Sequence, residues 1–165
     1  MRGHDVHDYA VTIDWTGDRG TGTSGYRDYD RHHTVSAAGK PTIAGSADPV
    51  FRGAPDRWTP EDLLVAALAQ CHLLWYLHLA ADAGVLVTGY HDQASGSLLI
   101  EPDGGGRFTE VVLRPRVTVR RPEHAGRAQA LHVEANRLCF IARSVSFPVR
   151  HEPITLVEPG TAGAG

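Results

Sequence analysis

The first third of the chain carries a pattern typical of short strands. Apolar residues alternate with polar or small ones from residue 9 to residue 15, and this period of two predicts a half-buried β-strand. Weaker pieces of the same pattern lie between residues 26 and 43 and predict two further short strands. Proline and glycine then recur through residues 45–58, which we expect to form an irregular loop.

The longest apolar pattern of the chain has helical spacing. Thr59 is a suitable N-cap, Pro60 fits the first helical position, and Glu61 and Asp62 place carboxylates near the positive end of a helix dipole. Gly84 stands where a C-terminal cap is expected. The apolar positions between these ends are Leu63, Leu64, Ala67, Leu68, Cys71, Leu74, Trp75, Leu79 and Ala80. So wide an apolar face predicts a helix buried in the centre of the fold or in a subunit interface.

The remaining pattern changes between strands and a second helix. Residues 85–100 and 108–120 are expected to be strands joined by a glycine-rich hairpin turn, and Pro115 predicts an edge strand or a bulge. Helical spacing returns over residues 122–137, and a last strand is expected at 154–157. The order of strands, helix, strands, helix and strand predicts the α+β class.

Length, composition and charge narrow the class of protein. The chain has 165 residues, of which 42% are hydrophobic, so we expect one domain over residues 1–158 and a flexible small-residue tail over 159–165. A formal net charge of -3 gives no electrostatic reason to expect a nucleic-acid partner. No secretory leader is visible, and no run approaches the roughly 20 apolar residues of a membrane span. A soluble, cytoplasmic protein without a membrane partner is therefore predicted.

Two cysteines, Cys71 and Cys139, are the residues with the most distinctive chemistry. They stand 68 positions apart, which fits neither a zinc knuckle nor a disulfide framework. In a reducing compartment they are either two buried thiols or a reactive couple. Buried thiols are the commoner case in general.

The ten histidines do not predict a metal site. Cys71 and the adjacent His72 point about 100 degrees apart on a helix, and His78 lies about 10 Å from Cys71 along the axis. We therefore expect no metal and no bound cofactor. Trp58, Trp75, Phe51 and Tyr76 are interpreted as core or pocket-wall residues, and their apolar surface would suit a hydrophobic substrate.

Two segments resemble a known family. Residues 58–72, with the Pro60-Glu61 helix start ten residues before Cys71, resemble the signature of the OsmC/Ohr hydroperoxide reductases. Residues 139–148, from Cys139 to Pro148, look like the second-cysteine segment of the same family. The resemblance extends from about residue 9 to residue 157. Thr59 replaces the commoner asparagine of the family pattern but is still a good N-cap.

The resemblance implies both a fold and a site. It implies an OsmC-like fold, with antiparallel sheets packed on long central helices, in an intertwined homodimer with two active sites at the interface. Cys71 is then the peroxidatic thiolate, activated by an arginine that Glu61 holds. Arg52 is the first choice for that arginine because a guanidinium can pair bidentately with a carboxylate and still donate to sulfur; Arg27 and Arg31 are the alternatives.

The resemblance also implies an activity and its partners. An organic hydroperoxide would oxidise Cys71 to a sulfenic acid, Cys139 would resolve it as a disulfide, and an external dithiol, from a lipoylated protein or a thioredoxin-type donor, would reduce it. A redox-sensing or small-ligand-binding protein on the same fold is the alternative. A metal-dependent hydrolase is a third possibility, for which the sequence offers no convergent ligand set.

Overall fold

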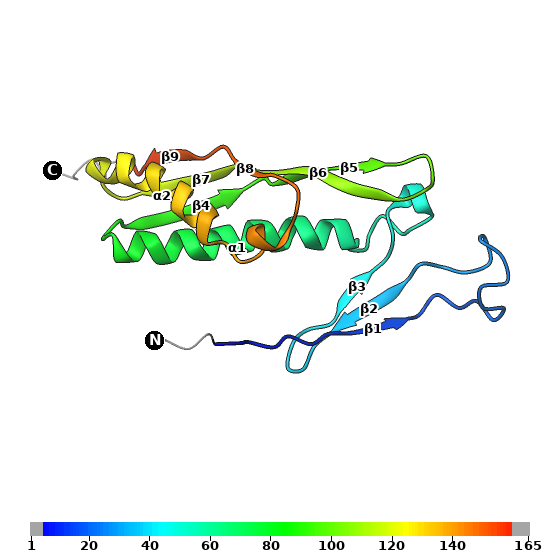
Figure 1. Ribbon diagram of the computed structural model, residues 1–165. Coiled ribbons are helices and arrows are strands. Elements are labelled where there is room, and N and C mark those ends of the chain that lie inside the picture. Colours follow the sequence, from blue (N-terminus) through cyan, green and yellow to red (C-terminus); the bar gives the residue numbers. More distant parts are fainter. Residues whose placement is uncertain (1–4, 160–165) are drawn as a thin grey trace. The chain divides into compact units, whose positions relative to one another are not determined.

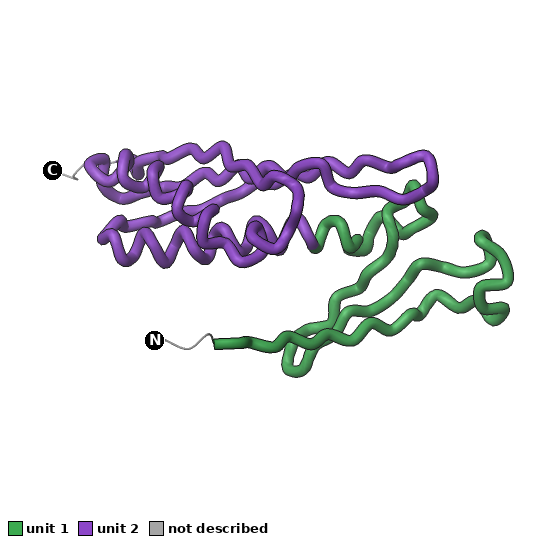
Figure 2. The backbone as a smooth tube through the Cα atoms, in the orientation of Figure 1, with its two compact units in different colours: residues 1–63 green, residues 64–165 purple. Residues whose placement is uncertain are grey.

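The computed structural model describes residues 5–159, so all but the first residue of the predicted tail lies outside the described residues. The chain forms two compact units, residues 1–63 and residues 64–165 (Figure 2). Each unit is described by itself. The single domain over residues 1–158 stays a prediction.

Unit 1 is built on a small antiparallel sheet. Its strands are β1 (Thr12–Trp15), β2 (His33–Ser36) and β3 (Ile43–Gly45), in that order across the sheet (Figure 1). The three predicted strands are confirmed, although β1 begins at Thr12 rather than at residue 9. β1 begins where its pairing begins, because Thr12 is the first residue opposite β2, at Ser36. All four residues of β1 are exposed, so the half-buried face predicted from the alternating pattern is not observed. The predicted loop contains one 3-10 turn, η1 (Pro49–Phe51).

The long predicted helix is α1 (Pro60–Asp82). Its start is fixed by a reciprocal pair of hydrogen bonds: the Asp62 N–H donates to Thr59 Oγ1, and the Thr59 N–H donates to Asp62 Oδ2, both at 3.1 Å. Gly84, just past its end, has φ +69°, the left-handed conformation that glycine adopts without strain. The N-cap and C-terminal cap predicted from the sequence are both confirmed.

Unit 2 contains two three-stranded sheets. The first has the order β4 (Val87–Asp92), β7 (Pro115–Val119), β9 (Ile154–Val157). The second has the order β5 (Ser95–Ile100), β6 (Gly106–Leu113), β8 (Val149–His151). The pairs β4–β7 and β5–β6 are antiparallel, and β9 and β8 join them in parallel.

Four details of unit 2 differ from the sequence prediction. The single strand expected over residues 85–100 is two strands, β4 and β5, and the single strand expected over residues 108–120 is also two, β6 and β7; the members of each pair lie in different sheets. The edge position expected for the strand with Pro115 is wrong, because β7 lies between β4 and β9. A proline fits there because it is the first residue of the strand. The short strand β8 was not predicted.

The second helix, α2 (Ala125–Leu138), follows the 3-10 turn η2 (Pro122–His124), and a further turn, η3 (Ala142–Ser144), precedes β8. Cys139 is the C-terminal cap residue of α2, with its N–H donating to the Ala135 carbonyl at 3.0 Å. The predicted helix and its cysteine end are therefore confirmed, with the first three residues forming the 3-10 turn instead.

Two apolar clusters hold unit 2 together along α1. Leu68 packs with Val111 and Leu113 of β6. Further along the helix, Tyr76 and Ala80 pack with Val117 and Val119 of β7 and with Ala128 and Ala135 of α2. Burial of these side chains is the main stabilising term for the unit. The fold is thus α+β, with α1 lying along both sheets of unit 2 (Figure 1).

The same helix bears on the membrane prediction. By length and composition alone, α1 could cross a membrane, contrary to the expectation that no run comes near that length. This is weak evidence, since the core helix of a soluble protein passes the same test. Glu61 and Asp62 in the first turn and the packing of Leu68 and Tyr76 in the two clusters are features of such a core helix.

Candidate active site

The two cysteines of unit 2 meet. Cys71, in the middle of α1, and Cys139, at the end of α2, lie close enough that Cys71 contributes to the raised pKa of Cys139. Both are free thiols. Residues 68 positions apart in sequence are therefore close enough to interact directly, which is the arrangement that a disulfide requires.

The two thiols differ in environment. Cys71 is half-buried, whereas Cys139 is 1% exposed. Burial, followed by the interaction with Cys71, raises the pKa of Cys139 to about 11, and the Ala142 N–H at 3.4 Å from its sulfur offsets this in part. Cys139 is therefore a protonated thiol at neutral pH. Cys71 is the more accessible of the two.

A buried histidine pair connects the same two helices as the cysteines. His72 on α1 and His132 on α2 are both 0% exposed, and His72 Nε2 lies 2.9 Å from His132 Nδ1. Their rings are nearly parallel, with an interplanar angle of 5°. Tyr76 stacks on His132 with ring centroids 4.1 Å apart, and His151 of β8 lies 5.7 Å from His72.

Burial changes the acid–base behaviour of this cluster. It lowers the pKa of His72 from the ordinary 6.5 to about 4, with a smaller contribution from His151. It lowers the pKa of His132 to about 3, with contributions from His72 and His151, and it also lowers the pKa of His151. The pair is neutral near pH 7, so one ring N–H donates to the other ring nitrogen.

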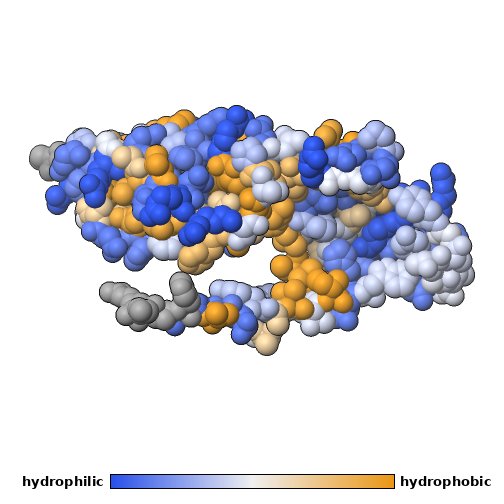
Figure 3. Space-filling view, in the orientation of Figure 1, coloured by the Kyte–Doolittle hydropathy of each residue, from blue (hydrophilic) through white to orange (hydrophobic). Residues whose placement is uncertain are grey.

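An apolar groove begins one turn from Cys71. Its volume is about 360 Å³, and it is lined by Leu74, Trp75, His78 and Phe140. The three α1 residues follow Cys71 at spacings of three, four and seven, so they share its side of the helix. Phe140, which follows Cys139, is 64% exposed and meets the Trp75 ring edge-on at 5.5 Å. The groove thus runs along α1 from Cys71. Figure 3 shows hydrophobic residues on the surface of both units.

Unit 1 holds a second, more polar pocket of about 320 Å³. Arg31, His33, Asp48 and Glu61 contribute its polar groups. Its apolar wall is formed by Trp15, Tyr29, Ala47, Phe51 and Pro60. Glu61 lies in the first turn of α1, so a helix start, a strand and two loops bring a carboxylate and a guanidinium to one concave surface.

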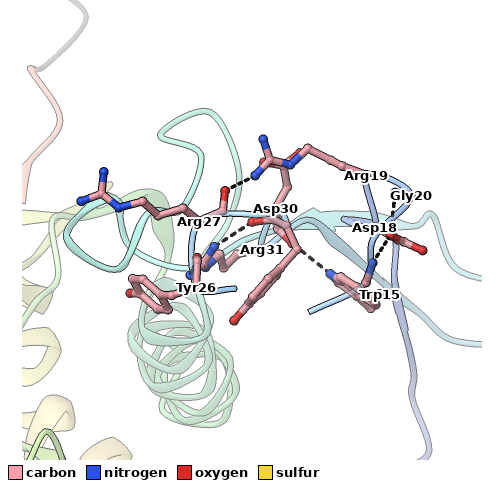
Figure 4. Close-up of polar contacts among 10 residues, drawn as sticks. Trp15, Asp18, Arg19, Gly20, Tyr26, Arg27, Asp30 and Arg31 are labelled. Atoms are coloured by element: carbon pink, nitrogen blue, oxygen red, sulfur yellow. Dashed lines mark hydrogen bonds and ion pairs between the residues drawn. The ribbon is translucent and has the colours of Figure 1, made fainter. Parts of the chain in front are cut away.

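Arg31 is anchored firmly in this pocket. Its guanidinium donates to the carbonyls of Tyr29 at 2.7 Å and Tyr26 at 2.8 Å, and it stacks over both tyrosine rings at 4.2 and 4.3 Å (Figure 4). Trp15 supports the same loop by donating from its ring N–H to the Asp30 carbonyl at 2.9 Å. Two of the five guanidinium N–H donors are used by the carbonyls, which leaves others free to bind a ligand.

The other two candidate arginines lie differently. Arg52 is exposed, ends η1 in a left-handed conformation with φ +67°, and is not part of the pocket lining. Arg27 is also exposed, and its carbonyl accepts a hydrogen bond from Arg19. Arg31 is therefore the one of the three that shares a pocket with Glu61, although within residues 5–159 the two form no ion pair.

Some of this site was not visible in the sequence. His132 and His151 were not candidates, although the seven-residue spacing from His132 to Cys139 places both on one face of α2. No group of three or more metal-binding side chains gathers in the described part of the chain. Among the proposed wall residues, Trp75 lines the groove, Phe51 lines the pocket of unit 1, and Tyr76 is in the core.

Comparison with solved structures places the fold. An OsmC-like protein of unknown function from Vibrio cholerae O1 biovar eltor is 33% identical, with a TM-score of 0.79 over 90% of this chain and 100% of that one. An OsmC-like protein from Mycoplasma pneumoniae is 16% identical, with a TM-score of 0.70 over 91% of this chain and 98% of that one. An organic hydroperoxide resistance protein from Elizabethkingia anophelis is 18% identical, with a TM-score of 0.64 over 92% and 98%.

Of the two sequence comparisons, the one with family models agrees with the structural comparison. No curated protein matches the chain. The model of the OsmC-like protein family matches residues 53–153, which include α1, α2, both cysteines and every strand of unit 2 except β9. The chain therefore belongs to the OsmC-like protein family.

Proposed function

We propose that this protein is a thiol-dependent peroxidase that reduces organic hydroperoxides to alcohols through Cys71 and Cys139. The observation that carries the proposal is the proximity of two free thiols on α1 and at the end of α2, one accessible and one buried. A peroxidatic cysteine needs access to substrate, and a resolving cysteine needs to lie within bonding reach of it. Solved hydroperoxide resistance proteins of the same fold support this choice.

The proposed reaction has three steps. The Cys71 thiolate attacks the O–O bond, its sulfur becomes a sulfenic acid, and the leaving alkoxide takes up a proton to give an alcohol. The Cys139 thiol then displaces hydroxide from that sulfenic acid, and its proton leaves with the hydroxide as water. An external dithiol reduces the disulfide and is itself oxidised to a disulfide.

The first step needs a cation near Cys71, because an ordinary thiol, with a pKa of about 8.5, is mostly protonated at neutral pH. We assign this role to Arg31 rather than to Arg52, since Arg31 shares its pocket with Glu61. The tyrosine stacking and the two carbonyl contacts hold the guanidinium rigidly, and a rigid donor stabilises developing charge without reorganising. Glu61 would orient the remaining donors.

The spacing along α1 bears on how these groups meet. Glu61 and Cys71 are ten residues apart in one helix, which corresponds to about 15 Å along its axis. That is longer than the combined reach of the two side chains. We therefore propose that the protein is a homodimer in which Glu61 and Arg31 of one copy serve Cys71 of the other.

The substrate and the reductant follow from the same surfaces. The groove lined by Leu74, Trp75 and Phe140 suits the apolar part of a hydroperoxide. The reductant would be a dithiol of the lipoyl or thioredoxin type, because both cysteines must be reduced together. We place the reaction in the cytoplasm, where such dithiols keep thiols reduced.

The experiment that tests this function measures peroxide consumption by the purified protein with a dithiol reductant and no added metal. Cumene hydroperoxide and reduced lipoamide are suitable probes. Continuous consumption, with the reductant oxidised in equal amount, is the expected result. If the protein consumes only one equivalent of peroxide, whichever dithiol is added, the redox-sensing alternative is favoured. In that alternative Cys71 is oxidised once and a partner protein binds the oxidised form.

A further inference from the structure

The buried histidine pair has no role in the three steps above. His72 and His132 are as deeply buried as any side chain of the core, yet each brings polar nitrogens with it. Within residues 5–159, His72 Nδ1 and His132 Nε2 have no hydrogen-bond partner. A buried polar atom without a partner is destabilising, so an apolar pair of similar size would suit a purely structural core better.

The position of the pair is informative. His72 directly follows Cys71 on α1, and His132 lies two turns before Cys139 on α2. The two helices are thus joined twice near the same place, once by the thiols and once by the ring nitrogens at 2.9 Å. A directional hydrogen bond restricts both the distance and the rotation of the two helices, which an apolar contact does not.

We propose that the hydrogen bond between His72 and His132 is a positioning device that holds Cys139 where it can close a disulfide with Cys71. This inference rests on the proposed resolving role of Cys139. Disulfide closure is sensitive to position, because it requires Cα atoms within about 7 Å and a narrow range of dihedral angles. Loss of the pair therefore slows the second step and leaves the first unchanged.

A third connection between the helices supplies the matched control. The Tyr76 hydroxyl of α1 donates to the Ala128 carbonyl of α2 at 3.2 Å, four residues before His132. Tyr76→Phe removes this hydrogen bond and keeps the ring that stacks on His132. It weakens the attachment of α2 to α1 but leaves both histidines in place. It therefore shows how much disulfide formation changes when α2 is held less tightly for any other reason.

The variants of His132 separate hydrogen bonding from packing. His132→Leu fills the site but has no atom to pair with His72 Nε2. His132→Asn places an amide close to the position of the ring Nδ1 and can restore the pairing. On α1, His72→Gln keeps an amide near the ring Nε2 position, whereas the side chain of His72→Asn is one carbon too short to reach His132. If a His132 variant does not fold, the comparison of these two His72 variants tests the same hydrogen bond.

The test first measures the equilibrium of the Cys71–Cys139 disulfide in mixtures of reduced and oxidised dithiothreitol. We expect His132→Leu to weaken disulfide formation by about tenfold or more, since small misplacements of reacting groups have effects of this size. His132→Asn and Tyr76→Phe should remain within about threefold of wild type. Equal weakening in His132→Leu and Tyr76→Phe, or none in His132→Leu, would overturn the inference.

The second measurement follows one equivalent of cumene hydroperoxide in a single turnover. His132→Leu should form the Cys71 sulfenic acid at the wild-type rate, close the disulfide slowly, and accumulate sulfinic acid as peroxide is raised. Equal rates for both steps in wild type and His132→Leu would contradict the positioning role. The dithiothreitol equilibrium involves no peroxide, so failure of wild-type protein to react with peroxide would count against the proposed function and not against the histidine pair.

Discussion

The thiol of Cys71 on α1 lies beside the thiol of Cys139 at the end of α2 and helps to raise its pKa, and this second thiol is almost completely buried. The difference in burial supports the two roles that we propose for these thiols. Burial keeps Cys139 protonated, so it reacts poorly with an external oxidant but lies next to whatever forms on Cys71. The half-buried Cys71 is the one that a substrate can reach.

Replacement of the peroxidatic sulfur should remove the activity and leave the fold. Cys71→Ser is close to cysteine in size, but a serine hydroxyl is not ionised at neutral pH, so we expect turnover with cumene hydroperoxide to be lost. Circular dichroism and thermal unfolding should remain close to those of wild type. Undiminished dithiol-dependent turnover by this variant would reject the assignment of Cys71.

The two arginines can be told apart by kinetics. Arg31→Ala should slow the first step by about 10²- to 10³-fold, the usual effect of removing one preorganised donor. Arg52→Gly is the control, because glycine removes the guanidinium and suits the left-handed backbone at φ +67°. It should leave that step within about twofold of wild type. Stopped-flow measurement of sulfenic acid formation checks this, and a reversed order would restore Arg52 as the activating residue.

Complementation tests whether two copies share each site. Chains carrying Cys71→Ser and chains carrying Glu61→Gln should each be nearly inactive alone. If Glu61 of one copy serves Cys71 of the other, each mixed dimer has one intact site, so random mixing should restore about one quarter of wild-type activity. Light scattering must show a dimer in parallel. A fully active monomer, or no recovery in mixed dimers of proven composition, would contradict the shared site.

The histidine cluster predicts how stability depends on pH. In the unfolded chain His72 and His132 take up protons near pH 6.5, but in the folded protein the pKa values are about 4 and about 3. Between these values the unfolded state binds more protons, so stability is full above about pH 7 and falls as the pH decreases below 6.5. The groups that face the pair are His151, whose pKa burial also lowers, and Tyr76.

Urea unfolding between pH 7.5 and pH 4.5 measures this effect. Each histidine contributes about 1.4 kcal/mol per pH unit, so the free energy of unfolding should fall on the order of 3 to 5 kcal/mol over the range. His72→Gln, which keeps an amide in place of the ring nitrogen but does not titrate, should reduce the slope by about half, because His132 still titrates. An unchanged slope in this variant would assign the pH dependence to other groups.

The parts of the fold that were predicted correctly carry local signals. The ends of α1 follow from Thr59, Asp62 and Gly84, whose side chains or backbone fix a helix end within one turn. The strand β8 was missed because it has three residues and joins its sheet in parallel with β6, a pairing that no local pattern specifies.

Only the part of the candidate site that has a local sequence signal was predicted. A motif identifies Cys71, Glu61 and Cys139 by spacing along the chain. The histidine pair depends on how two helices pack, and the choice of Arg31 depends on where a loop places its guanidinium. Neither is encoded in the residues next to those positions, and tertiary structure was needed to find both.

The most direct test of the central claim is peptide mapping under non-reducing conditions after treatment of the reduced protein with one equivalent of cumene hydroperoxide. The account predicts that both thiols are consumed and that one intramolecular disulfide joins Cys71 to Cys139. Cys139→Ser is the control: it should react once, stop, and carry sulfenic or sulfinic acid on Cys71. If wild-type protein instead carries oxidised Cys71 beside an untouched Cys139 thiol, the buried cysteine is structural, and the protein is not a two-cysteine peroxidase.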